Sequence, residues 1–144
     1  DNSSIRYGIL NYVAKYSLAK NSYFVTSKCY EHLNNLNLMK NGKLLRGSKG
    51  SKNKFTFEHP VPSNVIADEV IKNTGDKNKI KKILRETDLV TVITYQENDM
   101  ITKSGFANEM PENSFVKKNM FARYEMSGVE VPSRKIEVYG AIAR

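Results

Sequence analysis

The sequence is poor in the residues that most often carry covalent or metal chemistry. Among its 144 residues there are one cysteine, two histidines and no tryptophan. The single cysteine, Cys29, excludes an internal disulfide, and without a cysteine cluster there is no Cys-based structural zinc site. Because Cys29 lies in a stretch with helical apolar spacing, we expect a small buried side chain there rather than a nucleophile. The expected setting is the reducing cytoplasm.

Long apolar runs are also lacking. No stretch approaches the roughly 18 consecutive apolar residues that a membrane-spanning helix requires, and no short apolar run with a small-residue cleavage site opens the chain. We therefore expect no membrane span and no retained signal peptide. Hydrophobic residues still make up 40% of the chain, which is enough for one core. The expectation is one domain covering residues 1–144.

Positive charge is abundant and unevenly distributed. The formal net charge is +8, and residues 1–60 carry ten basic side chains against three acidic ones. Residues 40–54, called the basic segment below, contain no acid. Its cations are Lys40, Lys43, Arg46, Lys49, Lys52 and Lys54. Three glycines and several small polar residues accompany these cations, so we expect a solvated loop rather than a helix, with phosphate as its commonest partner.

The hydrophobic pattern predicts a mixture of helices and strands. Apolar residues at helical spacing predict helices in residues 4–20, around Cys29, Leu33 and Leu36, after Ser63, after Asp76, and in residues 116–127. Strand composition marks residues 55–57, residues 89–95 as a central strand, and a final strand through Ile136 and Val138 toward Ala141. Asn41-Gly42 predicts a turn. The predicted fold class is therefore α+β, with N-terminal helices and a small mixed sheet.

His59 is the residue best placed for acid–base chemistry. It follows Glu58 at the end of a predicted strand, and two prolines, Pro60 and Pro62, stiffen the turn after it. Phosphodiester cleavage requires a group that exchanges a proton near neutral pH beside a site that stabilises negative charge. The lysines of the basic segment lie only a few residues away. The alternative is that His59 is an ordinary turn residue, and for His32 we expect a structural or surface role.

The residues Glu58, His59 and Pro62 resemble the opening element of HNH-type nucleases, in which a strand ends in an acid, a catalytic histidine and a proline three residues later. The resemblance covers about ten residues and implies that His59 is a general base beside one divalent metal such as Mg²⁺. No histidine follows His59, so the second histidine ligand of the family is missing. Its replacements would be Asn64, Asp68 or Asn73.

A metal-free route to the same reaction is the alternative. In size, charge and sparse histidine the chain resembles small toxin-like ribonucleases, which use the RNA 2′-hydroxyl as nucleophile. That resemblance implies no cofactor, with His59 as the base and Arg123 and Tyr124 as an adjacent cation and phenol. Tyr124 also fits the apolar face of its predicted helix, so core packing is its alternative role. Thr94 ends a predicted strand, where α/β sites often gather.

These observations lead to three hypotheses. The first is a nuclease, acting on RNA rather than DNA, with His59, Glu58, Arg123, Tyr124 and Thr94 as catalytic candidates. In it Lys43, Arg46, Lys49, Lys52 and Lys54 grip the backbone, and a toxin or defence nuclease would also need an acidic inhibitor or immunity protein. The second is a nucleic-acid-binding module without catalysis. The third is an interaction protein whose basic segment docks on an acidic partner.

Overall fold

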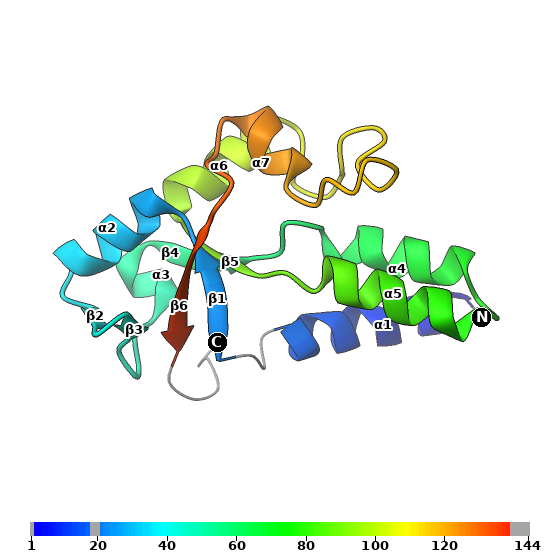
Figure 1. Ribbon diagram of the computed structural model, residues 1–144, viewed down its shortest axis with the longest axis horizontal. Coiled ribbons are helices and arrows are strands. Elements are labelled where there is room, and N and C mark those ends of the chain that lie inside the picture. The colour runs from blue at the N-terminus through cyan, green and yellow to red at the C-terminus, as the bar shows by residue number, and fades with distance from the viewer. Residues whose placement is uncertain (1, 18–20, 139–144) are drawn as a thin grey trace.

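Six short strands form one mixed sheet in the computed structural model, which describes residues 2–17 and 21–138 (Figure 1). The strands are β1 (Ser22–Val25), β2 (Met39–Lys40), β3 (Lys43–Leu44), β4 (Phe55–Glu58), β5 (Thr91–Thr94) and β6 (Arg134–Val138). Their order in the sheet is β2-β3-β6-β1-β5-β4. β1 pairs in parallel with β5, and β3 pairs in parallel with β6, whereas the other three pairings are antiparallel.

Seven helices lie in the same described residues. They are α1 (Asn2–Ser17), α2 (Ser27–Asn35), α3 (Gly50–Asn53), α4 (Ser63–Lys72), α5 (Lys77–Thr87), α6 (Tyr95–Lys103) and α7 (Ala122–Ser127). Figure 1 shows α1, α4 and α5 grouped at one end of the molecule, while β2, β3 and α3 lie at the other end. Helices and a mixed sheet in one chain confirm the predicted α+β class. No described helix has the length and apolar character needed to cross a membrane.

The predicted central strand is an internal strand of the sheet, although it is shorter than expected. β5 covers four residues rather than the seven of 89–95, and all four are buried. It ends early because the Thr94 side chain accepts a hydrogen bond from the amide of Glu97 and so caps α6. Tyr95 therefore begins a helix instead of extending the strand.

Several helix ends follow the sequence, and two features differ from it. Asp76 caps α5 by accepting a hydrogen bond from the amide of Lys79 at 3.0 Å, and Gly128 ends α7 at a φ of 72°. Ser63, however, is not the cap of α4, because Pro62 occupies that position without a side-chain hydrogen bond. The basic segment, expected to be a loop, contains the one-turn helix α3.

The helix expected in residues 116–127 is wrong over its first half. Only Ala122–Ser127 is helical, and the preceding residues form turns in which Asn113 and Lys118 have φ values of 60° and 53°. The amide of Asn119 bonds to the carbonyl of Ser114, so local turns satisfy this backbone. As a result Val116, expected on the buried face, is 82% exposed. Residue Ala141, expected at the end of the last strand, lies outside the described residues.

Candidate nucleic-acid interface

The basic segment folds as a hairpin followed by a single helical turn. Asn41 and Gly42 make the predicted turn between β2 and β3, with φ values of 51° and 73°. After the hairpin, α3 packs so closely on β4 that a Cβ placed on Gly50 would lie 2.3 Å from the carbonyl oxygen of Phe55. Only glycine fits this approach, so the glycine that predicted flexibility instead permits tight packing.

Neighbouring helices hold the segment in place. The Nε2 atom of His32, on α2, lies 2.7 Å from the carbonyl oxygen of Asn53 at the end of α3. The amide of Tyr95, at the start of α6, donates a 2.9 Å hydrogen bond to the carbonyl of Lys54. His32 therefore has the structural role that was expected of it, and the segment is anchored at its C-terminal end.

This arrangement creates a pocket with a strongly cationic lining. Its volume is about 430 Å³, and no carboxylate is among the residues that line it. The lining residues are Leu38, Leu45, Arg46, Gly47, Ser48, Lys49, Lys52 and Asn53. The three cations Arg46, Lys49 and Lys52 are all exposed, so a phosphate could reach them from solvent. We call this feature the basic pocket.

Two further cations of the segment, Lys43 and Lys54, lie outside the lining of this pocket. The Lys43 ammonium is 2.8 Å from a carboxylate oxygen of Glu137. The Lys54 ammonium lies over the ring of Tyr95, 5.6 Å from its centroid. Of the five cations predicted to grip a nucleic-acid backbone, the structure therefore brings three together in the basic pocket and directs two to other partners.

Four of the five catalytic candidates converge at the other end of β4. The Glu58 carboxylate accepts hydrogen bonds from Arg123 Nη1 at 2.6 Å and from the Tyr124 hydroxyl at 2.5 Å. Arg123 also donates to the backbone carbonyls of His59 and Pro60. Its other nitrogens donate to two more backbone carbonyls, those of residues 106 and 107. We call Glu58, His59, Arg123 and Tyr124 the internal cluster.

Three members of the internal cluster, Glu58, Arg123 and Tyr124, are shielded from solvent. The side chains of Arg123 and Glu58 are 3% and 11% exposed, and Tyr124 is fully buried. Burial raises the pKa of Glu58 against the opposing effect of the Arg123 charge, and burial with the Glu58 charge raises the pKa of Tyr124 well above its usual range. Because Arg123 directs its donors to Glu58 and to backbone carbonyls, it holds residues 58–60 and 106–107 onto α7. This geometry is that of a clamp inside the fold.

His59 itself is half-buried, with its side chain in a poorly solvated position. Its Nε2 atom is buried and has no hydrogen-bond partner within the described residues. Burial lowers the pKa of His59, the Asp88 charge opposes that shift, and the Arg123 charge adds to it. At neutral pH the imidazole is therefore neutral.

The structure does not bring His59 to the basic pocket. Lys54 precedes the first residue of β4 and His59 follows the last, so the strand separates them by roughly 10 Å or more. Thr94 is also apart from the internal cluster, because in the β4–β5 register it pairs with Phe55 while Glu58 pairs with Thr91. Its hydroxyl and amide are used in the capping box with Glu97.

The residues that would replace the missing HNH ligands have other partners. Asn64 donates to the carbonyl of Asn108, Asp68 pairs with Arg6, and Asn73 donates to the carbonyl of Glu69. Within residues 2–17 and 21–138 no group of three or more His, Cys, Asp or Glu side chains has a metal-binding arrangement. Each of Asn64, Asp68 and Asn73 is therefore engaged by another residue of the fold.

Sequence reasoning missed two features of these sites. The Arg123 clamp depends on contacts between residues more than 60 positions apart in the sequence, and no local sequence pattern predicts them. The capping box of Thr94 and Glu97 does have a local signal, the spacing Thr-x-x-Glu before a helix. Comparisons with family models, curated proteins and solved structures found no match to this chain.

Proposed function

We propose that this protein binds the phosphate backbone of nucleic acid through the basic pocket, as a binding module. The observation that carries the proposal is the pocket lining, in which Arg46, Lys49 and Lys52 surround one cavity without a neutralising carboxylate. Three like charges in one lining repel one another, and a bound phosphate relieves that repulsion while releasing counterions.

The anchoring of the segment also supports binding. Hydrogen bonds from His32 and Tyr95 fix the C-terminal end of the segment before any ligand arrives. A site that is already ordered loses less conformational entropy on binding than a free loop would. Cations on an ordered backbone therefore bind a phosphate with a smaller loss of conformational entropy than the same cations on a disordered tail.

Cleavage by His59 is a second candidate function, and one observation favours it. Glu58, His59, Arg123 and Tyr124, which the sequence proposed as catalytic, lie in one cluster. Burial and the internal use of the Arg123 donors argue against it, because a substrate phosphate would have to displace contacts that hold the fold. We therefore place binding without cleavage first.

The experiment measures binding and cleavage on the same samples. Labelled single-stranded RNA, single-stranded DNA and duplex DNA are titrated by fluorescence anisotropy at several salt concentrations. The variant Arg46→Gln/Lys49→Gln/Lys52→Gln should bind more weakly and have a flatter salt dependence, by roughly two to three in the slope of log K against log salt concentration. The control Lys77→Gln/Lys79→Gln/Lys81→Gln removes the same charge from α5, at the other end of the molecule.

The outcomes separate the hypotheses. If both triple variants lose affinity equally, the attraction comes from net charge and the basic pocket is not the site. If labelled RNA is cut and the His59→Ala variant does not cut it, the function is cleavage. Addition of EDTA then distinguishes an HNH-like metal mechanism from the metal-free one. If no nucleic acid binds at any salt concentration, both candidate functions are wrong.

A further inference from the structure

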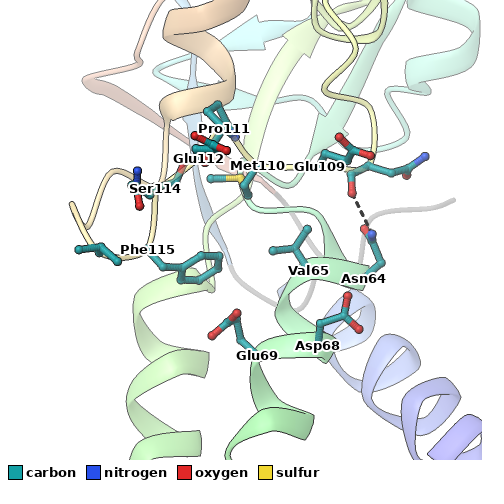
Figure 2. A pocket seen from close by; sticks show the side chains of 13 residues that line it. Asn64, Val65, Asp68, Glu69, Glu109, Met110, Pro111, Glu112, Ser114 and Phe115 are labelled. Carbon is teal, nitrogen blue, oxygen red and sulfur yellow. Dashed lines mark hydrogen bonds between the residues drawn. The ribbon is translucent and has the colours of Figure 1, made fainter.

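A second, differently charged groove lies between α4 and the segment 108–116, near the group of helices α1, α4 and α5 (Figure 2). Its volume is about 690 Å³, within the range of ligand pockets. The side-chain amide of Asn64 donates to the carbonyl of Asn108 at 2.8 Å, so a hydrogen bond ties the segment to the helix along the groove. The groove is thus built by two elements that are joined to each other.

The floor of the groove is apolar. Val65, Met110 and Phe115 are only partly buried, and they pack against the core that includes Ile66 and Val70. Figure 2 shows the three side chains directed toward the space between α4 and the segment. Val116, which also lines the groove, is 82% exposed. An exposed apolar side chain beside an apolar floor is typical of a surface that receives another molecule.

The rim of the groove is acidic, in a protein whose net charge is +8. Asp68 and Glu69, from α4, pair with Arg6 and Lys72. From the opposite side the segment contributes Glu109 and Glu112, which are exposed and form no ion pair with any residue the structure describes. Lys117 and Lys118 follow along the chain but are not part of the lining. The rim therefore offers two unneutralised carboxylates above an apolar floor.

We propose that this groove docks a peptide segment of a partner protein in which lysine or arginine side chains flank an apolar anchor. The anchor packs on Val65, Met110 and Phe115, and the cations meet Glu109 and Glu112. Charge complementarity selects this occupant, because an acidic or nucleic-acid ligand would be repelled by the rim. The groove is distinct from the basic pocket, so the proposal does not depend on nucleic-acid binding.

The test uses the full chain labelled with ¹⁵N and three peptides. The pentapeptide Lys-Leu-Lys-Leu-Lys combines charge with an anchor, Lys-Ser-Lys-Ser-Lys has the charge alone, and Glu-Leu-Glu-Leu-Glu has the anchor with the wrong charge. We expect the first peptide to shift the amide resonances of residues 64–69 and 108–116 in a saturable way. The other two peptides should bind at least several-fold more weakly.

Matched variants locate the contact. Glu109→Gln/Glu112→Gln should lower the affinity for the first peptide about three- to tenfold, as expected for the loss of two exposed ion pairs. Glu31→Gln/Glu86→Gln removes the same charge from α2 and α5 and should leave affinity unchanged. Val116→Ser should also weaken binding, and this exposed residue can be changed with little effect on folding.

Three results would overturn the proposal. Equal binding of Lys-Ser-Lys-Ser-Lys, or equal competition by spermine, would mean that only an acidic surface is present. Resonance shifts outside the groove, or none at millimolar peptide, would remove the docking site. Concentration-dependent self-association in sedimentation velocity that Glu109→Gln/Glu112→Gln abolishes would mean that the occupant is a second copy of this chain.

Discussion

The hydroxyl of Thr26 donates a 2.9 Å hydrogen bond to Oε2 of Glu97, 71 residues away. The same oxygen accepts from the amide of Thr94 at 2.9 Å and from its hydroxyl at 3.0 Å. Thr26 directly follows β1 and is the N-cap of α2. Thr94 is the last residue of β5, which is parallel to β1, and is the N-cap of α6. One buried carboxylate oxygen therefore joins two strand ends to two helix starts.

Removing the Glu97 carboxylate should lower the stability of the fold. We expect Glu97→Ala to lower the free energy of unfolding by about 2–3 kcal/mol, because it leaves the Thr26 and Thr94 donors buried without their acceptor. Glu97→Gln should cost less, since its amide oxygen can still accept. Urea denaturation followed by circular dichroism measures both. The control Glu31→Ala alters an exposed residue of α2, and a loss as large as that of Glu97→Ala would show that the shared oxygen is not the cause.

The clamp of the internal cluster leads to a second prediction. Arg123→Met leaves the Glu58 carboxylate buried without its cation, so we expect a loss of about 3–5 kcal/mol in unfolding free energy. The double variant Arg123→Met/Glu58→Gln should recover part of this loss, because it removes the unpaired charge. Tyr124→Phe, which deletes one hydrogen bond to Glu58, should cost only about 1 kcal/mol.

A catalytic role would give a different pattern from a clamp. If Arg123→Met folded with unchanged stability and abolished cleavage of labelled RNA, the internal cluster would be a catalytic site. Thermal unfolding and the cleavage assay on the same protein separate these cases. A double variant less stable than Arg123→Met would contradict the charge-burial explanation.

The fold was predictable where local chemistry determines it. The Asn41-Gly42 turn, the caps by Asp76 and Gly128, and the buried strand β5 all follow from residue type and spacing. The prediction failed at residues 116–121, where an apolar pattern compatible with a helix is overridden by turns that Ser114 and Asn119 stabilise. Periodicity cannot distinguish a helix from successive turns, and the turns bury a different set of side chains, since Val116 is exposed.

The candidate site was predictable in composition but not in arrangement. Clustering of Arg46, Lys49 and Lys52 is visible in the sequence, and the structure joins them because the loop of residues 45–49 and α3 line one cavity. Separation of His59 from these cations is not visible, because proximity in sequence suggested contact while the extended strand β4 carries them apart. The convergence of Glu58 with Arg123 was equally hidden, since it requires the path of the whole chain.

His59 leads to a prediction about pH. Burial lowers the pKa of His59 in the folded protein below its ordinary value of about 6.5, which it keeps in the unfolded chain. At pH values between the folded and the unfolded pKa, the unfolded state therefore binds more protons. The His59 contribution to stability is therefore complete above about pH 6.5 and is lost as pH falls through the folded-state pKa. The raised pKa of Glu58 acts in the opposite direction, because its contribution is lost as pH rises through the folded-state value.

The two effects can be separated by subtraction. We expect the difference in unfolding free energy between the wild type and His59→Gln to decrease as pH falls from 7.5 to 5, and Glu58 cancels in that difference. Urea denaturation at each pH measures it, with His32→Gln as the control. A difference that stays constant across this range would show that His59 is solvated in the folded protein.

Gly50 links the stability of α3 to the basic pocket, and it has a natural control in Gly8. A Cβ on Gly50 would lie 2.3 Å from the Phe55 carbonyl oxygen, whereas a Cβ on Gly8, within α1, meets nothing within 4 Å. We expect Gly50→Ala to lower the unfolding free energy by about 1–3 kcal/mol and to weaken nucleic-acid binding, because α3 must move away from β4. Gly8→Ala should raise stability by about 0.5–1 kcal/mol and leave binding unchanged. Anisotropy and urea denaturation on both variants provide the measurement. Normal nucleic-acid affinity in a destabilised Gly50→Ala protein would mean that the position of α3 does not control the pocket.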